Sequence, residues 1–306
     1  MDDSTRRPSG LMVWVKRLGL LAAVLALGLL ALYAFARWKY TAALDTVHVV
    51  DDPPLAFAGD DAERARGAHL YQVVGCVECH AAGGVGKVVF DAGPVATVVG
   101  PNLTPAALGD RYDADALAAA IRHGVRPDGR PLRFMPVGDF TNLSDADTAA
   151  LVRHLQSLPP STNVPGEFRV GPLGYVLYLA GKVHLVPADE IDHAPRARSA
   201  PPEGPTAAYG GYLAQVCTGC HGSGFAGQRV PGTPPEIPPA ANLTPHADGL
   251  KAWAEADFFR ALREGRRPDG STLHPFMPWQ TYGAMTDVEL QAIWAHLRTL
   301  PPTPDR

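Results

Sequence analysis

Two short clusters of cysteine and histidine are the residues of this chain best suited to redox chemistry. They read CVECH at residues 76–80 and CTGCH at residues 217–221. C-x-x-C-H is the pattern at which haem c is attached to protein. Two thiols at this spacing reach the two vinyl groups of the porphyrin, and the adjacent histidine falls beneath the iron. The predicted residues for two covalently bound haem c groups are Cys76, Cys79 and His80 in one cluster and Cys217, Cys220 and His221 in the other.

Zinc binding and dithiol exchange are the alternatives for a C-x-x-C pair. A structural zinc ion usually takes four protein ligands, whereas each cluster offers two cysteines and one histidine. No strand–helix–strand pattern of the kind that surrounds redox dithiols is recognisable around either cluster. The chain has four cysteines, and the two clusters use all of them, which leaves none for a disulfide or a distal thiolate ligand.

Methionine thioethers are the candidates for the second axial position of each iron. Met135 follows His80 by 55 residues and Met277 follows His221 by 56, each within the sequence FMP. A thioether opposite histidine stabilises Fe(II) and raises the reduction potential. Methionines that merely fill gaps in a core are the alternative, but the repeated spacing favours ligation. Met285 has no methionine counterpart in the first copy, and we expect it to be a packing residue.

Both clusters lie within an internal repeat with an offset of 140–142 residues. The segments NLTP, RPDG, FMP and LPP recur in the same order after each cluster. A repeat of about 100 residues is a domain rather than a solenoid unit. We therefore expect domains at residues 60–160 and 203–303, joined by a proline-rich segment, 161–202, that contains an apolar stretch at 171–187.

The same coarse order of helices is expected in each copy. A first helix leads into the cysteines, a second ends at a glycine, and a third begins at a capping serine or threonine. The predicted helices are 62–74, 113–123 and one after Ser144 in the first copy, and 207–216, 254–264 and one after Thr286 in the second. We expect no strand, so the predicted fold is all-α with long loops.

Residues 18–36 form an uncharged apolar segment near the N-terminus. At about 1.5 Å per residue, a helix of this length just spans a hydrocarbon core of about 30 Å. Basic residues are more numerous before it than after it, which places the segment 1–17 in the cytoplasm and the body outside. A cleaved signal peptide, with Ala34-Phe35-Ala36 as its site, is the alternative, although this apolar run is longer than usual for one.

The remainder of the chain is acidic. Residues 1–39 hold six basic and two acidic side chains and so carry a net charge of +4. Because the whole chain carries −4, the residues after 39 carry a net charge of −8. A basic face for nucleic acid is therefore not expected. Apolar residues make up 46% of the chain, which is enough for substantial cores.

The chain resembles a class I cytochrome c twice over, and more closely the diheme and multiheme cytochrome c subunits of bacterial periplasmic dehydrogenases. The resemblance covers about residues 60–303 and is carried by the CxxCH motifs, GPNLTP and AANLTP, the RPDG and FMP segments, and the final helices ending in LPP. It implies two tandem class I cytochrome c domains, and with the apolar segment 18–36 the expected fold is all-α, with an N-terminal transmembrane helix followed by these two domains.

Further residue roles follow from the resemblance. Pro101 is expected to present its carbonyl to the ring of His80, and Ala241 stands at the corresponding position of the second copy. Aromatic and basic side chains are expected near the haem propionates, with plain core or surface roles as the alternative; they are Tyr112, Arg126, Trp253 and Arg267. The first and last helices of each domain are expected to cross at a small residue beside an aromatic, at Gly67 with Tyr71 and at Ala208 with Tyr212.

The function that the resemblance implies is electron transfer at the periplasmic face of a bacterial inner membrane, without substrate chemistry. The expected partners are membrane lipid, a periplasmic dehydrogenase as electron donor, and a soluble cytochrome or an oxidase as acceptor. Two alternatives remain open. One is a diheme subunit of a terminal oxidase of the cbb3 kind, and the other is a diheme cytochrome c peroxidase, which needs one iron with an open position.

Overall fold

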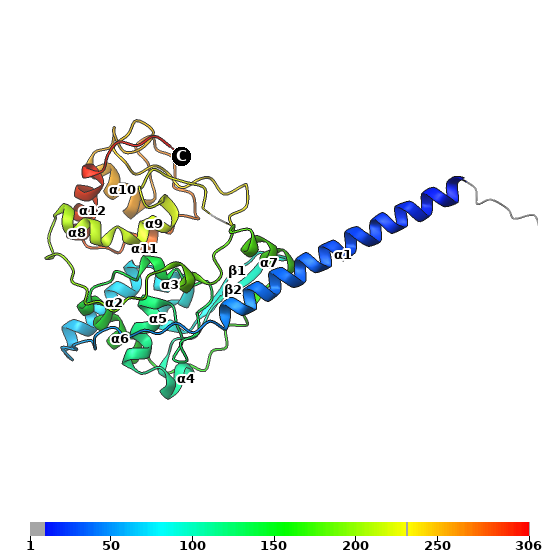
Figure 1. The fold of residues 1–306 in the computed structure, drawn as a ribbon. Coiled ribbons are helices and arrows are strands. Elements are labelled where there is room, and N and C mark those ends of the chain that lie inside the picture. Colours follow the sequence, from blue (N-terminus) through cyan, green and yellow to red (C-terminus); the bar gives the residue numbers. More distant parts are fainter. Residues whose placement is uncertain (1–9, 231, 306) are drawn as a thin grey trace, which may run out of the picture.

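The computed structural model describes residues 10–230 and 232–305 as one long helix attached to a body of two parts (Figure 1). The long helix, α1 (Gly10–Leu44), contains the predicted segment 18–36 and extends away from the body. It is the one helix among the described residues that is long and apolar enough to span a membrane. Residues 1–9 of the predicted cytoplasmic segment lie outside the described residues.

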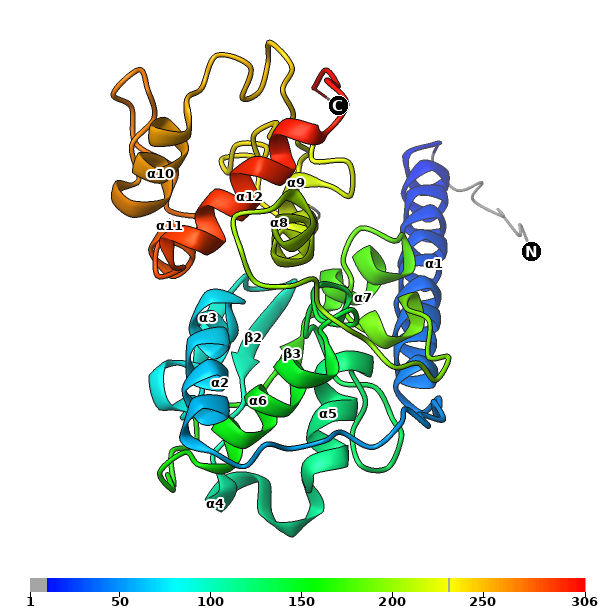
Figure 2. The same cartoon turned by 90° about the vertical axis from the view of Figure 1, so that its left-hand side faces the viewer.

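Each part of the body is built mainly from helices, as the repeat predicts, and Figure 2 shows one part above the other. The first part contains α2 (Asp61–Val73), α3 (Cys76–His80), α4 (Pro105–Leu108), α5 (Ala114–His123) and α6 (Asp145–Gln156). The second contains α8 (Ala207–Leu213), α9 (Gln215–His221), α10 (Glu255–Glu264), α11 (Trp279–Tyr282) and α12 (Asp287–Thr299). Between them lies α7 (Pro172–Leu179). Short 3₁₀ turns are η1 (Ala82–Gly84), η2 (Gly109–Arg111), η3 (Val137–Asp139) and η4 (Pro187–Glu190).

The predicted capping residues and terminal glycines are present, but the predicted helix 207–216 is divided at Ala214 into α8 and α9. Ser144 and Thr286 accept hydrogen bonds from the backbone N–H three residues later and so begin α6 and α12. Glu289 completes a capping box at α12 by accepting from the Thr286 N–H at 2.8 Å. Gly124 and Gly265 end α5 and α10 with φ of +64° and +69°, a conformation that glycine adopts without strain.

The first and last helices of each part pack together through a glycine. A Cβ on Gly67 would lie 1.9 Å from the Ala150 carbonyl oxygen, and a Cβ on Gly210 would lie 1.8 Å from that of Ala292. The predicted contact at Gly67 is therefore confirmed. The prediction of Ala208 for the second crossing is wrong, because Ala208 is exposed and Gly210 occupies the crossing. The turn before the CxxCH helix is shorter in the second part, which moves the crossing along α8.

A small sheet contradicts the all-α prediction. β1 (Lys87–Asp91), β2 (Ala96–Gly100) and β3 (Arg169–Val170) pair antiparallel in the order β1-β2-β3. The physical reason is visible in the sequence: two runs rich in valine flank the turn residues 92–95, a hairpin pattern. The body is mostly helical, but the long loop after the first CxxCH motif is partly a sheet.

Buried apolar residues of both parts form one continuous cluster, with Leu70 and Leu151 from the first part and Leu290 and Leu297 from the second. Polar side chains lie along the same seam. Glu289, which is 1% exposed, accepts hydrogen bonds from Arg66 at 3.1 Å and from His69 at 2.8 Å, both across the seam. The Tyr212 hydroxyl of the second part donates across the seam to Asp147 of the first part, at 2.6 Å.

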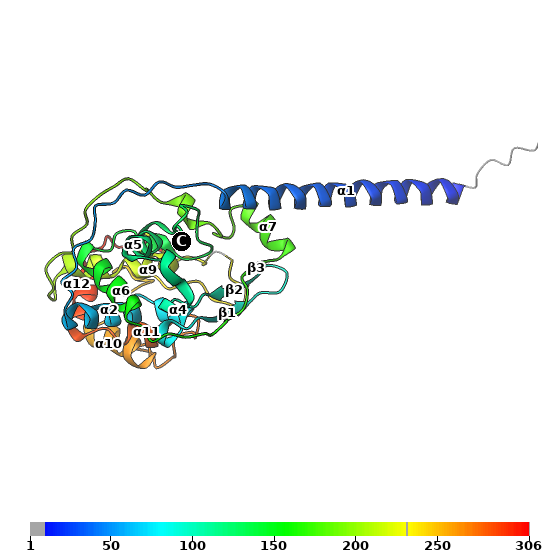
Figure 3. The same ribbon diagram turned by 90° about the horizontal axis from the view of Figure 1, so that it is seen from below.

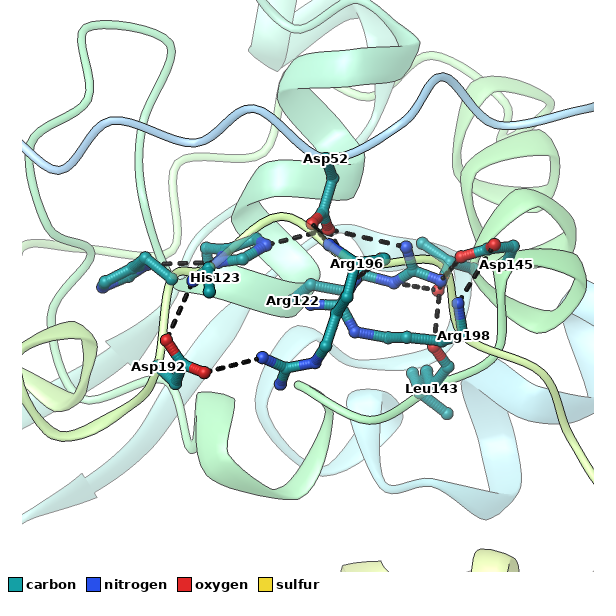
Figure 4. A network of polar contacts seen from close by, with 11 residues as sticks. Asp52, Arg122, His123, Leu143, Asp145, Asp192, Arg196 and Arg198 are labelled. Carbon is teal, nitrogen blue, oxygen red and sulfur yellow. Dashed lines mark hydrogen bonds and ion pairs between the residues drawn. The ribbon is translucent and has the colours of Figure 1, made fainter.

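A buried ionic network fastens the chain between α1 and α2 to the first part (Figure 4). Asp52 accepts from His123 at 2.9 Å and from Arg198 at 2.5 Å, and Arg122 donates to Asp145 at 2.7 Å. Burial acts to raise the pKa of Asp52, but the hydrogen bonds from His123 and Arg198 outweigh it and lower that pKa to about 2. The segment between α1 and α2, residues 45–60, is thereby held against the first part of the body.

The ionisation of Glu289 is expected to stabilise the union of the two parts. Burial acts to raise its pKa, but hydrogen bonds from His69 and Thr286 and the charge of Arg66 lower it to about 2, from 4.5. A carboxyl whose pKa is lower in the folded state stabilises fully above its unfolded pKa and loses that contribution as the pH falls toward 2. We expect Glu289→Gln to lower the free energy of unfolding at pH 7 by roughly 1–3 kcal/mol.

The control is Glu255→Gln, at an exposed position in the first turn of α10, for which a change within about 0.5 kcal/mol is expected. Denaturant unfolding of both variants and the wild type would be measured at pH 7, 5 and 3. The gap between wild type and Glu289→Gln should narrow as the pH falls below about 4.5, because the carboxyl then becomes protonated in the unfolded chain while it stays ionised in the folded protein until about pH 2. A gap that is independent of pH would contradict this assignment.

Candidate functional site

Each CxxCH motif forms a short helix that presents its side chains together. The first motif is α3, and the second is formed by residues 217–221 at the C-terminal end of α9. Cysteines three positions apart lie on the same side of a helix. Both helices end directly after the histidine at a residue of positive φ, Ala81 at +62° and Gly222 at +79°. The chain turns away there, and the Tyr71 hydroxyl donates to the Ala81 carbonyl at 2.9 Å.

The two histidines are oriented in the same way. His80 Nδ1 lies 2.9 Å from the Pro101 carbonyl oxygen, and His221 Nδ1 lies 2.6 Å from the Ala241 carbonyl oxygen. A carbonyl can only accept, so Nδ1 carries the proton and Nε2 keeps its lone pair for a metal. Burial lowers the pKa of both histidines, and these hydrogen bonds oppose it in part.

Close backbone packing brings the two carbonyls to the histidines. In the first part β2 delivers Pro101, and a Cβ on Gly100 would lie 1.9 Å from the Cys79 carbonyl oxygen. In the second part an isolated bridge between Gln228 and Ala240 takes the place of the hairpin. The same histidine contact is therefore reached from a sheet in one domain and from a single bridge in the other.

The asparagine of each NLTP segment holds this loop in place, a role that the sequence pattern alone does not predict. Asn102 Oδ1 accepts from the Thr104 N–H at 2.9 Å, while Nδ2 donates to the Ser161 carbonyl at 2.9 Å. The second copy repeats both contacts at 2.8 Å: Asn242 Oδ1 accepts from the Thr244 N–H, and its Nδ2 donates to the Thr303 carbonyl. The recurrence of NLTP at 102–105 and 242–245 is the feature of the sequence that points to this structural role.

The two methionine loops are fixed against the ends of the middle helices. The residue two positions after each methionine packs on the terminal glycine: a Cβ on Gly124 would lie 3.2 Å from Val137, and one on Gly265 would lie 2.6 Å from Trp279. Met135 and Met277 are half-buried and pack against the core. Phe134 has a φ of +61°, a strained conformation that commonly marks a ligand-holding segment.

The residues expected near the propionates differ between the domains. Tyr112 and Trp253 are half-buried at the edge of the core. Arg126 lies near Tyr112, and its buried Nε has no hydrogen-bond partner, since the Asp128 carboxylate is 3.6 Å away. A haem propionate would complete that donor. Arg267 instead donates to the Thr272 carbonyl at 2.8 Å within its own turn.

The donor set fits haem c better than zinc or a reactive dithiol. No group of three or more His, Cys, Asp or Glu side chains among residues 10–230 and 232–305 is arranged to hold a metal ion. Burial raises the pKa of Cys76 and Cys217 to about 12, the opposite of the lowered pKa of redox-active thiols. Half-buried cysteines next to a carbonyl-oriented histidine, in a domain that also holds a half-buried methionine, suit the two thioether bonds and two axial ligands of haem c.

The two CxxCH motifs contact each other's domain at equivalent positions, which the sequence analysis did not predict. Glu78, inside the first motif, accepts a hydrogen bond from Thr281, four residues after Met277. Gly219 holds the same place in the second motif, and a Cβ there would lie 3.2 Å from Asp139, four residues after Met135. Burial raises the pKa of Asp139 to about 7. Each motif therefore lies against the methionine loop of the other domain.

Both domains match models of known protein families. Residues 62–155 match the model described as cytochrome c oxidase, cbb3-type, subunit III, and residues 207–301 match the model for cytochrome c. Together these matches imply two covalently bound haem c groups, one in each domain.

Similar proteins include cytochrome subunits of several bacterial dehydrogenases. The chain is 28% identical over 285 residues to the cytochrome c subunit of alcohol dehydrogenase (quinone) from Gluconacetobacter polyoxogenes, across 80% of this chain and 57% of that protein. It is 33% identical to the fructose dehydrogenase cytochrome subunit of Gluconobacter japonicus, across 31% of this chain and 21% of that protein. It is 34% identical to the gluconate 2-dehydrogenase cytochrome c subunit of Pantoea cypripedii, across 28% of this chain and 21% of that protein. The chain thus spans little more than half the length of the first of these relatives.

Proposed function

Because this chain carries two cytochrome c domains and is related to cytochrome c subunits of quinone-dependent bacterial dehydrogenases, we propose that it is a membrane-anchored diheme electron carrier. Its role is to transfer electrons and not to transform a substrate. The observation that carries the proposal is the pair of equivalent sites, each with a carbonyl-oriented histidine and a fixed methionine loop.

Each haem c supplies a centre that gains or loses one electron at its iron. The chain's own residues decide how that centre behaves. His80 and His221 would bind the haem irons through Nε2, and Met135 and Met277 would bind them through their thioethers, which would leave neither iron a position for substrate. The half-buried methionines and the surrounding core limit the access of water and favour the reduced state.

Electron exchange between the two domains is supported by the contact of each CxxCH motif with the other domain. Glu78 with Thr281 and Gly219 with Asp139 tie the attachment segments to one interface. The buried contacts of Glu289 and Tyr212 fix the two domains in that arrangement. A fixed interface favours fast exchange because no domain movement is needed.

The proposed location is the periplasmic face of a bacterial inner membrane, with α1 as an uncleaved single-pass anchor and its N-terminus in the cytoplasm. The length of α1 and its lack of burial over the apolar window support the anchor. A periplasmic dehydrogenase is the proposed donor, and a soluble cytochrome or an oxidase the acceptor. The acidic body suits a basic docking face on a partner.

A subunit of a terminal oxidase is the second candidate. The match of residues 62–155 to the model of a cbb3-type oxidase subunit favours it. Relatives that align across both domains are cytochrome c subunits of quinone-dependent alcohol dehydrogenases, which favours the first candidate. Isolation of the full chain in mild detergent distinguishes the two. We expect a dehydrogenase to co-purify, whereas co-purification of an oxidase would favour the second candidate.

Exchange of each axial methionine should shift one haem potential at a time. We expect Met135→His to lower the potential of one haem by on the order of 0.1 V, within the ≈0.8 V that axial ligands span, because imidazole favours Fe(III) more than a thioether does. Met277→His should shift the other haem equally. Optical redox titration of the full-length variants measures both.

The matched control is Met285→Leu. Met285 is 2% exposed and packs in the core, so its exchange should leave both potentials where they are. Unchanged potentials in Met135→His, or equal shifts in all three variants, would contradict the assignment of the ligands.

A further inference from the structure

Helix α7 lies beside α1 at the end of α1 that enters the body (Figure 1). Three aromatic pairs join the two helices: Tyr33 to Tyr175 at 5.9 Å between ring centroids, Tyr40 to Tyr175 at 5.4 Å, and Tyr40 to Tyr178 at 5.5 Å. Among the α1 residues whose burial is described, Ala36 and Tyr40 are buried, and Tyr40 also packs against Leu185 and Val186. The contact is therefore close and covers little more than two turns of α1.

The level of this contact follows from the geometry of the helix. A hydrocarbon core of about 30 Å takes about 20 residues at 1.5 Å each. A span that begins at Leu18 thus ends near Trp38, between the contacts at Tyr33 and Tyr40. Figure 3 shows α7 as one of the parts of the body that reach furthest along α1. α7 is then level with the outer boundary of the hydrocarbon.

The composition of α7 suits that level. Its sequence PLGYVLYL has no charged residue. Leu173 is 45% exposed, and Val176 and Leu177 are half-buried. The apolar cluster under α7 includes Tyr175 and Tyr178 but not these three residues, among those that the structure describes. Leu173 and Leu177 are one turn apart and share a face of the helix.

Basic residues lie on both sides of this apolar helix. Arg169 precedes it in β3 and Lys182 follows it, while Arg37 and Lys39 leave α1 at the same level. All four are exposed. Apolar residues between cations are typical of segments that lie in a membrane interface, since the cations reach the phosphate groups of the lipids.

Backbone contacts fix α7 on the first domain. The Gly171 N–H donates to the Val95 carbonyl at 2.8 Å, and the Leu173 N–H donates to the Pro94 carbonyl at 3.0 Å. A Cβ on Gly174 would lie 2.1 Å from the Val95 carbonyl oxygen. The helix therefore cannot move without the hairpin of the haem domain, and whatever holds α7 also orients that domain.

We propose that α7 is a second membrane contact, inserted into the interface of the outer leaflet beside α1, with phospholipid as the partner of Leu173, Val176 and Leu177. The proposal rests on the proposed anchor. Together, α1, α7 and the Asp52 network hold the first haem domain at one height and orientation above the bilayer, where a membrane-bound partner would meet it.

Photocrosslinking in phospholipid nanodiscs tests this contact on the full chain. Leu173→p-benzoylphenylalanine probes α7, and Leu25→p-benzoylphenylalanine probes the middle of α1. Phe276→p-benzoylphenylalanine is the control on the body, since Phe276 is 46% exposed and Leu173 is 45% exposed. After illumination, intact-protein mass spectrometry measures the fraction of chain that carries one phospholipid.

We expect a lipid adduct at positions 25 and 173, with a yield at 173 roughly tenfold above that at 276, because benzophenone reacts only with groups it touches and only the first two sites would touch lipid. An adduct at 25 without one at 173 overturns the proposal and leaves the anchor intact. No adduct at 25 overturns the anchor itself. Equal yields at 173 and 276 also overturn the proposal, since the body would then contact lipid without preference for α7.

Discussion

The hydrogen bond from each ligand histidine to a backbone carbonyl is the contact on which the rest of this structure depends. It keeps the proton on Nδ1 of His80 and His221 and leaves Nε2 available to iron. Close backbone packing brings each carbonyl to its histidine. This explains the glycine at position 100, which packs against Cys79, and the hydrogen bonds by which Asn102 holds the turn that follows. Much of the loop structure around each motif serves this one bond.

The interface between the two domains reflects the internal repeat of the sequence. Equivalent positions meet across it, Glu78 with Thr281 and Gly219 with Asp139, so each attachment motif rests on the other domain's methionine loop. Buried charges along such an interface are costly unless they are paired. Glu289 satisfies that condition through Arg66 and His69. The arrangement is consistent with two redox centres that work as one unit.

Local signals carried most of what the sequence predicts correctly: caps at Ser144 and Thr286, terminal glycines, and the motif spacing all act within a few residues. The sequence does not predict the hairpin at residues 87–100, because its short valine runs lie inside a glycine-rich loop and the pattern around them is helical. Contacts between distant segments, such as Glu289 with His69 or Tyr40 with Tyr175, leave no periodic trace in one sequence. The offset between the two cysteine motifs predicts a crossing at Ala208, but the turn before the second motif is shorter, and the helices cross at Gly210.

Carbon monoxide binding to the fully reduced, full-length protein is the most direct test of the central claim that both irons are saturated by histidine and methionine. The account predicts that the optical spectrum of the reduced protein stays unchanged when carbon monoxide is added at neutral pH, because no position is open in either domain. A carbon monoxide spectrum for one of the two haems would contradict it. It would mean that Met135 or Met277 leaves its iron on reduction, as a peroxidase requires.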